Sequence, residues 1–174
     1  LADKETFSLA EKILIMGGRF NEKIAEWNIE IDPDAAKIVF GCGVPVTCVS
    51  FDATKKTSMT RADVEKINGL SAPADQYLAQ MMNRWIEHYD EFWVGEKLPL
   101  LHDLLAVATL INEEVCKYES IYFSVPLQGQ YESCTLRNNA GEGYFANVGI
   151  DINEEAFYRL FRENFFNERE ENQQ

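Results

Sequence analysis

Residues 12–51, KILIMGGRFNEKIAEWNIEIDPDAAKIVFGCGVPVTCVSF, decide the fold of this chain. The segment begins with a short apolar run at residues 12–16, which two glycines close and which is typical of a buried strand followed by a turn. Residues 44–51 are a second apolar run, for which we expect a second buried strand. A strand, a helix and a strand within about 40 residues predict a parallel βαβ unit and therefore an α/β fold.

The helix of this unit has signals at both ends. Asp32 fits the N-cap position and Pro33 the first helical position. Apolar residues at helical spacing then carry the predicted helix to Gly41 or Gly43. Between the first strand and this helix, residues 19–32 are expected to be a polar loop.

The rest of the chain continues the α/β pattern. Thr60 is expected to cap a short helix at residues 61–68, and a long helix is expected from Pro73 to Trp93. A closing amphipathic helix is expected at residues 154–166.

Residues 120–128, 132–138 and 144–150 are expected to be three antiparallel strands at an edge of the sheet. The sequence thus predicts part of an open, mostly parallel Rossmann-like sheet flanked by helices. Its single domain is expected to span residues 1–167, followed by a solvated tail at residues 168–174.

The composition excludes several classes of function. Lys and Arg number 16 against 29 Asp and Glu, a net charge of -13, which repels the phosphates of nucleic acids and of anionic lipid surfaces. No apolar run approaches the ~20 residues that a membrane span needs. The four cysteines show no C-x-x-C spacing and the first residues do not resemble a secretory signal, so reduced core cysteines and a cytoplasmic location are expected.

An ionisable pair, His102 and Asp103, begins the otherwise apolar segment 99–111, PLLHDLLAVATLI. An unpaired carboxylate in apolar surroundings is costly, so a compensating group is expected. Asp103 could be the N-cap of a helix at residues 104–111, or it could bind a metal ion. His102 could be a satisfied, partly buried imidazole or a general acid facing a cleft.

A second polar cluster lies in AEWNIEIDPDAA, residues 25–36. Glu26, Trp27 and Asn28 follow the first predicted strand, and open α/β sheets bind ligands beyond the carboxyl ends of their strands. Glu26 can accept hydrogen bonds and Asn28 can both donate and accept, so the pair could hold sugar hydroxyls. A solvated loop anchored by Trp27 is the plainer alternative.

Three separated motifs together carry a family resemblance. They are MGGRFNEKIAEWNIEIDPDAAKIVF (16–40), GVPVTCVSFDATKK (43–56) and PLLHDLLAVATLI (99–111), and the likeness continues through residues 125–161. This pattern resembles the C-terminal half of the inosine-uridine preferring nucleoside hydrolases. The resemblance implies hydrolysis of the N-glycosidic bond of purine or pyrimidine ribonucleosides to ribose and free base, assisted by one Ca²⁺ ion, in nucleoside salvage.

The resemblance also implies roles for individual residues. Asp103 matches a metal ligand, Glu26 and Asn28 match residues that grip the ribose 5′ end, and Trp27 replaces a ring that packs near the sugar. His102 matches the histidine beside the base, a candidate catalytic acid. Asn21 is the nearest counterpart of a further ribose-binding asparagine.

Aromatic residues of the family close over the base, and the matching residues here lie at the end of the long predicted helix. They are Tyr89, Phe92 and Trp93. Packing within the fold is the plainer expectation for these three side chains.

The chain departs from the family in one main respect. The D-x-D-x-x-x-D-D cluster, which supplies most metal ligands and the aspartate that deprotonates water, has no counterpart here. We therefore expect a C-terminal fragment, a cleaved piece or one chain of a split enzyme, inactive alone and partnered by the missing N-terminal half. The complete protein is expected to be a homodimer or homotetramer.

Two other functions remain open from the sequence. A non-catalytic relative that binds nucleosides or acts as a scaffold would also lack the aspartate cluster. Alternatively, His102 and Asp103 could be the metal pair of an HD-type phosphohydrolase, although that fold is all-helical and His88 is the only other histidine. The base preference does not follow from these residues.

Overall fold

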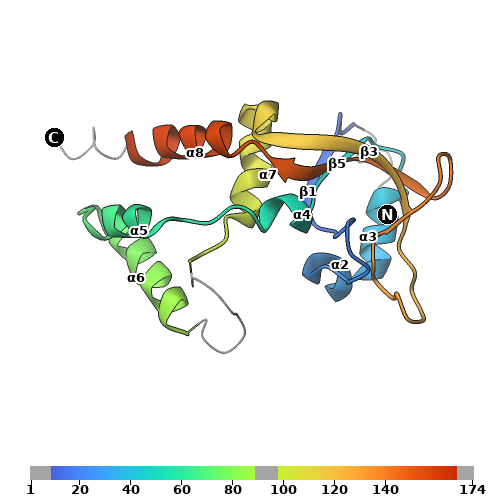
Figure 1. Ribbon diagram of the computed structural model, residues 1–174, viewed down its shortest axis with the longest axis horizontal. Coiled ribbons are helices and arrows are strands. Elements are labelled where there is room, and N and C mark those ends of the chain that lie inside the picture. Colours follow the sequence, from blue (N-terminus) through green and yellow to red (C-terminus); the bar gives the residue numbers. More distant parts are fainter. Residues whose placement is uncertain (1–8, 89–97, 168–174) are drawn as a thin grey trace.

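A computed structural model describes residues 9–88 and 98–167, which form a five-stranded sheet flanked by helices (Figure 1). The strand order is β1-β2-β5-β3-β4. The strands are β1 (Ile13–Met16), β2 (Val46–Val49), β3 (Cys116–Ser124), β4 (Leu136–Arg137) and β5 (Tyr144–Ile152). The predicted α/β fold, with its mostly parallel part and its antiparallel part, is confirmed.

The order of the strands corrects one expectation. β1 pairs with β2 in parallel, as the βαβ pattern predicts, and β2 then pairs in parallel with β5. β5 therefore lies inside the sheet and not at its edge, with β3 and then the two-residue β4 added antiparallel beyond it. The physical reason is burial: Val148 of β5 packs in the core of one face and Ile152 in the core of the other.

Helices and helical turns occupy most of the remaining described chain. They are α2 (Trp27–Ile31), α3 (Pro33–Phe40), α4 (Phe51–Thr54), α5 (Arg61–Asn68), α6 (Pro73–His88), α7 (His102–Ile111), η2 (Glu113–Val115), α8 (Glu154–Arg162) and η3 (Glu163–Asn167). The predicted caps are confirmed: the Asp32 carboxylate accepts from the Ala35 N–H at 2.9 Å, and Thr60 forms a reciprocal capping box with Asp63. The expected extension of α6 to Trp93 lies outside the described residues.

Two local expectations near the first strand are wrong. The expected polar loop at residues 19–32 contains α2, a helix of one turn that is capped by Glu26. β1 is only partly buried along its length, because it pairs with a single strand among the described residues and lies at the edge of the sheet.

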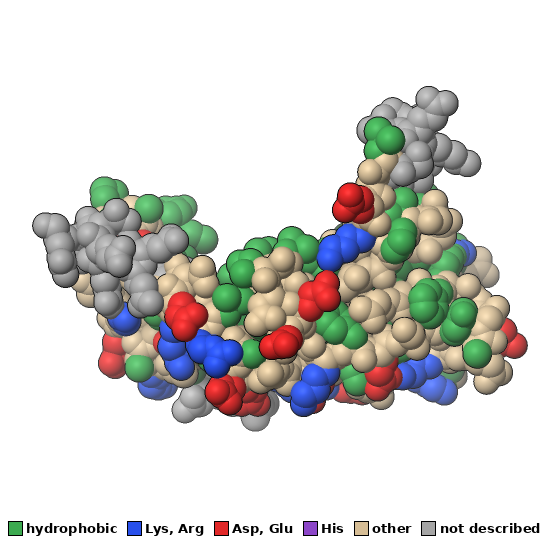
Figure 2. All heavy atoms as spheres, turned by 90° about the horizontal axis from the view of Figure 1, so that it is seen from above, with side chains coloured by type: hydrophobic (Ala, Val, Ile, Leu, Met, Phe, Trp, Pro, Cys, Tyr) green, Lys and Arg blue, Asp and Glu red, His purple; other side chains and the backbone are tan. Residues whose placement is uncertain are grey.

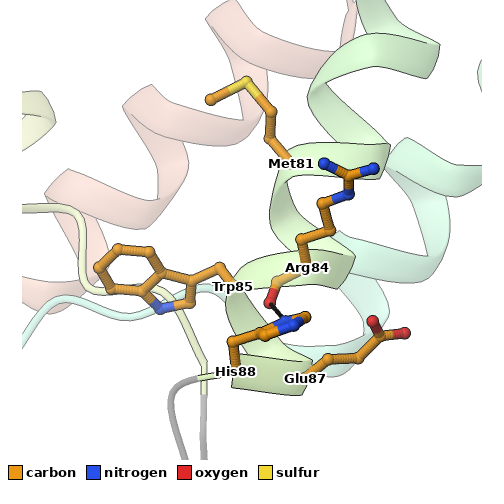
Figure 3. A pocket seen from close by; sticks show the side chains of 5 residues that line it. All are labelled: Met81, Arg84, Trp85, Glu87 and His88. Carbon is orange, nitrogen blue, oxygen red and sulfur yellow. Dashed lines mark hydrogen bonds between the residues drawn. The ribbon is translucent and has the colours of Figure 1, made fainter.

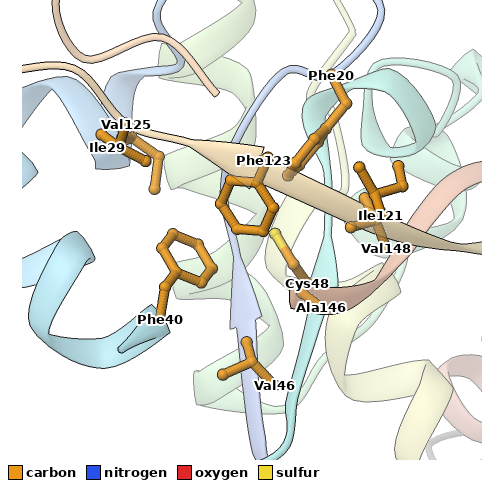
Figure 4. Close-up of a cluster of buried hydrophobic side chains, with 10 residues drawn as sticks. All are labelled: Phe20, Ile29, Phe40, Val46, Cys48, Ile121, Phe123, Val125, Ala146 and Val148. Carbon is orange, nitrogen blue, oxygen red and sulfur yellow. The ribbon is translucent and has the colours of Figure 1, made fainter. Parts of the chain in front are cut away.

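The core lies on both faces of the sheet. On one face, Phe20, Phe40 and Phe123 meet edge to face, with ring centroids 5.1 and 4.8 Å apart, between α3 and the strands (Figure 4). On the other face, Leu105 of α7 and Phe157 of α8 pack against the sheet. A third cluster joins α5, α6 and η3, which lie to one side of the sheet (Figure 1).

The four cysteines are free thiols, and Cys48, Cys116 and Cys134 are buried, as expected for core cysteines. Burial raises the pKa of the Cys48 thiol, which donates to the Gly17 carbonyl at 2.9 Å. Within the described part of the chain, no helix is long and apolar enough to span a membrane. The expected tail, residues 168–174, lies outside the described residues.

Candidate functional site

A cavity of about 800 Å³ opens at the carboxyl end of β1. Met16, the last residue of that strand, lines it together with both polar clusters of the sequence. The predicted site residues among its lining are Glu26, Trp27, Asn28, His102 and Asp103. The fold thus brings together segments that are about 75 residues apart in the chain, at the sheet edge where parallel strands end.

Glu26 is a buried carboxylate that the start of α2 holds in place. Its Oε2 atom accepts hydrogen bonds from the backbone N–H groups of Gly18, at 3.1 Å, and Asn28, at 3.0 Å. These two donors compensate for the burial of the charge. Oε1 accepts no hydrogen bond from a described residue and is not sealed from solvent, so it is available to a ligand in the cavity.

Trp27 and Asn28 form the first turn of α2, beside Glu26. The Asn28 side-chain amide donates to the Met16 carbonyl at 3.2 Å, which ties α2 to the end of β1. The Trp27 side chain is 71% exposed although it lines the cavity, so its ring covers no described core residue tightly and offers a flat apolar surface to a ligand.

His102 is held from two sides by α4. Its Nδ1 atom lies 2.7 Å from the Thr54 hydroxyl, and its ring stacks on Phe51 with centroids 5.7 Å apart. Burial lowers the pKa of His102 below its ordinary value, while the negative charges of Asp103 and Glu26 oppose that shift. The neutral imidazole is therefore favoured at neutral pH.

The structure excludes Asp103 as an N-cap. The helix α7 begins at His102, two residues earlier than an N-cap at Asp103 requires, and its N-cap position is occupied by Leu101 without a side-chain cap. The reason is that the Leu101 backbone is fixed on both sides, its N–H donating to Thr57 at 3.1 Å and its carbonyl accepting from Leu105 at 3.0 Å. The Asp103 side chain is exposed and makes no hydrogen bond with a described residue.

Asn21 is not among the described residues that line the cavity. Its side-chain oxygen accepts a hydrogen bond from Arg137 of β4 at 3.0 Å, and its backbone N–H points to the Asp52 carboxylate at 3.4 Å. In this arrangement Asn21 joins the loop after β1 to the far edge of the sheet.

Carboxylates line the cavity, but they do not form a complete metal site. Within residues 9–88 and 98–167, no group of three or more His, Cys, Asp or Glu side chains could hold a metal ion. The exposed carboxylate of Asp103, which bonds to no described residue, suits one ligand position of a hard cation such as Ca²⁺, which takes six to eight oxygens. The remaining ligands would have to come from outside the described residues.

Sequence reasoning missed three residues that shape the site. Phe51 and Thr54 position His102, and Arg19 lines the cavity. The signal that could have identified the first two is FDAT, residues 51–54, where polar residues follow directly after an apolar strand. Arg19 gave no comparable signal, because a single arginine in a polar stretch is most often solvated.

The second histidine, His88, lies in a separate, open pocket on α6 (Figure 3). Its Nδ1 atom pairs with the Arg84 carbonyl at 2.9 Å, one turn earlier in its own helix. The five-stranded sheet also contradicts the all-helical HD-type alternative, so His102 and Asp103 are not the metal pair of that fold. Tyr89, Phe92 and Trp93 lie outside the described residues.

Comparisons with known proteins agree on one family. The family model described as inosine-uridine preferring nucleoside hydrolase matches residues 1–159. The pyrimidine-specific ribonucleoside hydrolase RihA of Salmonella arizonae is 32% identical over 164 residues, which cover 87% of this chain and 51% of the relative. The chain thus spans about half the length of the curated relatives it matches.

Solved structures agree with this match. The structure of a purine-preferring ribonucleoside hydrolase from Gardnerella vaginalis superposes with a TM-score of 0.77 at 28% identity, covering 86% of this chain and 50% of that one. A plant nucleoside hydrolase shares the fold, with a TM-score of 0.72 at 24% identity over 87% of this chain and 52% of its own.

Proposed function

The chain belongs to the inosine-uridine preferring nucleoside hydrolase family, and from this membership we propose that it is the C-terminal portion of a ribonucleoside hydrolase. The complete enzyme cleaves the N-glycosidic bond of a purine or pyrimidine nucleoside to give ribose and free base. The proposal includes both base classes because one relative is named as pyrimidine-specific and another as purine-preferring.

One observation carries the proposal. The two polar clusters, Glu26 to Asn28 and His102 with Asp103, line the same cavity of about 800 Å³. This volume lies within the range of about 300–1,000 Å³ of small-molecule pockets, and the mixture of aromatic and polar lining suits a nucleoside.

The ribose fits the α2 side of the cavity. Oε1 of Glu26 accepts a hydrogen bond from a sugar hydroxyl, and Asn28 lies beside it on the first turn of the helix. The exposed ring of Trp27 packs against the sugar. Because Gly18 and Asn28 fix the other oxygen of Glu26, the sugar meets a pre-positioned acceptor.

The base fits the α7 side, where His102 acts on the leaving nitrogen. The Thr54 hydroxyl fixes the ring and can donate to Nδ1, which leaves the proton on the opposite nitrogen. Because burial favours the neutral imidazole, His102 gives up a proton readily once it is protonated. We expect His102→Ala to slow inosine hydrolysis on the order of 100-fold. The p-nitrophenyl riboside, whose leaving group needs no proton, should slow far less.

Asp103 is the residue of this chain that would hold Ca²⁺. A bound Ca²⁺ supplies oxygen coordination for the sugar diol and for the attacking water. In the complete protein, Asp103→Ala is expected to abolish calcium retention measured by elemental analysis. Unchanged metal content would contradict this ligand role.

The surface of the chain supports a missing N-terminal half as its partner. β1 is an edge strand with one described neighbour, and an edge strand presents a row of unpaired backbone N–H and C=O groups to which another segment can pair. Hydrophobic side chains gather along one rim of the molecule, opposite a rim rich in charged side chains (Figure 2). On α7, Val107, Leu110 and Ile111 are each more than half exposed at helical spacing.

Further expectations for the complete protein follow from the family. We expect a homodimer or homotetramer that acts in nucleoside salvage. The free cysteines support a cytoplasmic location, since reducing compartments keep thiols unpaired. The net charge of -13 supports a small-molecule substrate over nucleic acid or an anionic membrane.

A non-catalytic nucleoside-binding relative is the second candidate. The observation in its favour is that the described residues contain no group of three or more His, Cys, Asp or Glu side chains that could hold a metal ion. Such a protein would retain the cavity and its sugar contacts, but it would turn over no substrate even with a partner.

Activity and binding together test the proposal. The purified chain alone is expected to bind ribose and inosine, measured by tryptophan fluorescence because Trp27 and Trp85 line the cavity, and to hydrolyse neither inosine nor uridine. Adding the N-terminal half of the Salmonella arizonae relative as a separate polypeptide should restore release of ribose. Turnover by the chain alone would contradict the need for a second half, and absence of nucleoside binding would contradict the function.

A further inference from the structure

Arg19 lines the cavity, but neither the family motifs nor the proposed roles assign a function to it. It follows Gly18 after β1 and lines the cavity with Glu26 and His102. Its backbone is held by buried Thr135: the Arg19 N–H donates to the Thr135 hydroxyl at 2.9 Å, and that hydroxyl donates to the Arg19 carbonyl at 2.8 Å. This contact between residues 116 apart in the sequence therefore fixes the backbone of Arg19.

The Arg19 side chain and the His102 ring share one aromatic support. The guanidinium carbon lies 4.2 Å from the ring centroid of Phe51, and the His102 ring stacks on the same Phe51 ring. The Arg19 side chain is only 18% exposed, so most of it is withdrawn from water. Phe51 thus supports both the guanidinium and the imidazole proposed to face the base, and both residues line the cavity.

Arg19 has hydrogen-bond donors to spare. Its Nη1 atom donates to Glu22 at 3.3 Å, and its Nε atom is buried without a partner. Nη2 donates to no described residue and is not sealed from solvent. A guanidinium carries five N–H donors. The unpartnered Nε is unfavourable where it is buried, whereas the Nη2 donors, which water reaches, can be given to a ligand in the cavity.

The charge of Arg19 is also distinct within the site. Among the described residues that line the cavity, Arg19 alone carries a permanent positive charge, and Glu26, Glu30 and Asp103 are carboxylates.

When the glycosidic bond breaks, its electron pair leaves with the base nitrogen, and water oxygen bonds to the anomeric carbon. One water proton stays on the new hydroxyl, and the base finally takes the other. Until it does, negative charge is spread over the base nitrogens and carbonyl oxygens.

We propose that Arg19 binds the nucleobase, donating a hydrogen bond to a ring carbonyl oxygen and stabilising the negative charge that forms on the departing base. The inference rests on the proposed nucleoside hydrolase function and names its preferred substrates as oxo-bases, such as hypoxanthine and uracil. Adenine lacks such a carbonyl, so Arg19 contributes less to adenosine.

Lys55 provides a matched control. Its ammonium lies 6.0 Å from the same Phe51 ring and bonds to the same Glu22 at 3.0 Å, but Lys55 is not among the residues that line the cavity. A general effect of charge on Glu22 or Phe51 should therefore appear in Lys55→Met as well as in Arg19→Met. An effect through direct contact with the base should appear in the Arg19 variant alone.

Fluorescence titration of the 174-residue chain with ribose, hypoxanthine, inosine and adenosine tests the proposal. Arg19→Met is expected to weaken hypoxanthine and inosine about tenfold or more, as loss of a charged hydrogen bond does, and to leave ribose unchanged. The affinity of Arg19→Lys for hypoxanthine and inosine should lie between those of wild type and Arg19→Met. The affinity for adenosine should change less than that for inosine. The affinities of Lys55→Met should match those of wild type. Circular dichroism establishes that each variant is folded.

The outcomes separate this inference from the function on which it rests. If wild type binds ribose and inosine and Arg19→Met binds hypoxanthine equally well, the base-binding role of Arg19 is wrong while the function stands. Equal weakening of ribose and hypoxanthine would also overturn the role, because it would show a merely structural arginine. If wild type binds neither ribose nor inosine, the nucleoside function itself is wrong, and the inference fails with it.

Discussion

Asp52 and Asp103 occupy the same position in two helices beside the cavity, and their surroundings are opposite. Each is the second residue of its helix, α4 or α7, and neither N-cap residue forms a side-chain cap. Asp52 is 1% exposed, and its Oδ2 atom accepts from the Phe20 N–H at 2.6 Å and from the Ser50 hydroxyl at 3.4 Å. Asp103 is exposed and bonds to no described residue.

The difference shows that helix position alone does not give an aspartate its role. The loop after β1 folds over Asp52 and delivers backbone donors to it, so the carboxylate fixes the loop that carries Arg19. No described segment covers Asp103, so its carboxylate remains available to a ligand. Both benefit from the positive end of a helix, and tertiary contacts then separate a buried, structural acid from one whose carboxylate stays exposed.

The largest effect on stability is expected from Asp52→Ala. The change leaves the buried Phe20 N–H without an acceptor, and we expect the free energy of unfolding to fall by about 3 kcal/mol. Urea denaturation measures it. Asp52→Asn keeps one oxygen acceptor and should lose less; equal losses in the two variants would contradict the hydrogen-bonding role.

The loss of stability in Glu26→Ala is expected to lie between those of Asp52→Ala and Asp103→Asn, because Glu26 combines buried backbone donors with an open side toward the cavity. Loss of its bonds to Gly18 and Asn28 should cost about 1–2 kcal/mol in urea denaturation. Glu26→Gln retains an acceptor and serves as the control. A loss as large as that of Asp52→Ala would mean that Glu26 is as purely structural as Asp52.

Asp103 is expected to act on His102 through charge. Its carboxylate favours the imidazolium, so Asp103→Asn should lower the pKa of His102 further. Proton NMR measures this, because the chain has only two histidines and His88 provides the reference signal. A rise or no change in the pKa would contradict this proximity effect.

The lowered pKa of His102 also gives the sign of a pH dependence of the free energy of unfolding. The pKa of His102 is lower in the folded chain than the ordinary value of about 6.5, so the unfolded chain binds more protons between the two values. The stability contributed by neutral His102 is complete above pH ~6.5 and is lost as the pH falls toward the folded pKa. The variant His102→Gln should lose this part of the pH dependence in urea denaturation.

The smallest effect on stability is expected from Asp103→Asn. Because the carboxylate is exposed and unpaired among the described residues, the free energy of unfolding should change by no more than about 0.5 kcal/mol. A loss near that of Asp52→Ala would show that Asp103 has a structural partner and would remove the contrast between the two acids.

The sequence by itself determined most of the local elements. Asp32 with Pro33 begins α3, and Thr60 begins α5, because a helix cap is made within three or four residues. The parallel pairing of β1 and β2 likewise follows from a short strand-helix-strand pattern. The family motifs also led to the prediction of Glu26, Asn28, His102 and Asp103 as site residues; these four line one cavity, and their roles stay predictions.

Only the tertiary structure decided which side chains meet. In that structure β5 lies inside the sheet, and Asn21 contacts Arg137 instead of lining the cavity. The side chains of Arg19 and His102 both pack on the ring of Phe51. The tertiary structure also distinguished Asp52 from Asp103, whose local sequences offer the same helix position. The physical reason is that these outcomes depend on burial and hydrogen bonds between segments that lie 30 to more than 100 residues apart, and no pattern within a few residues records them.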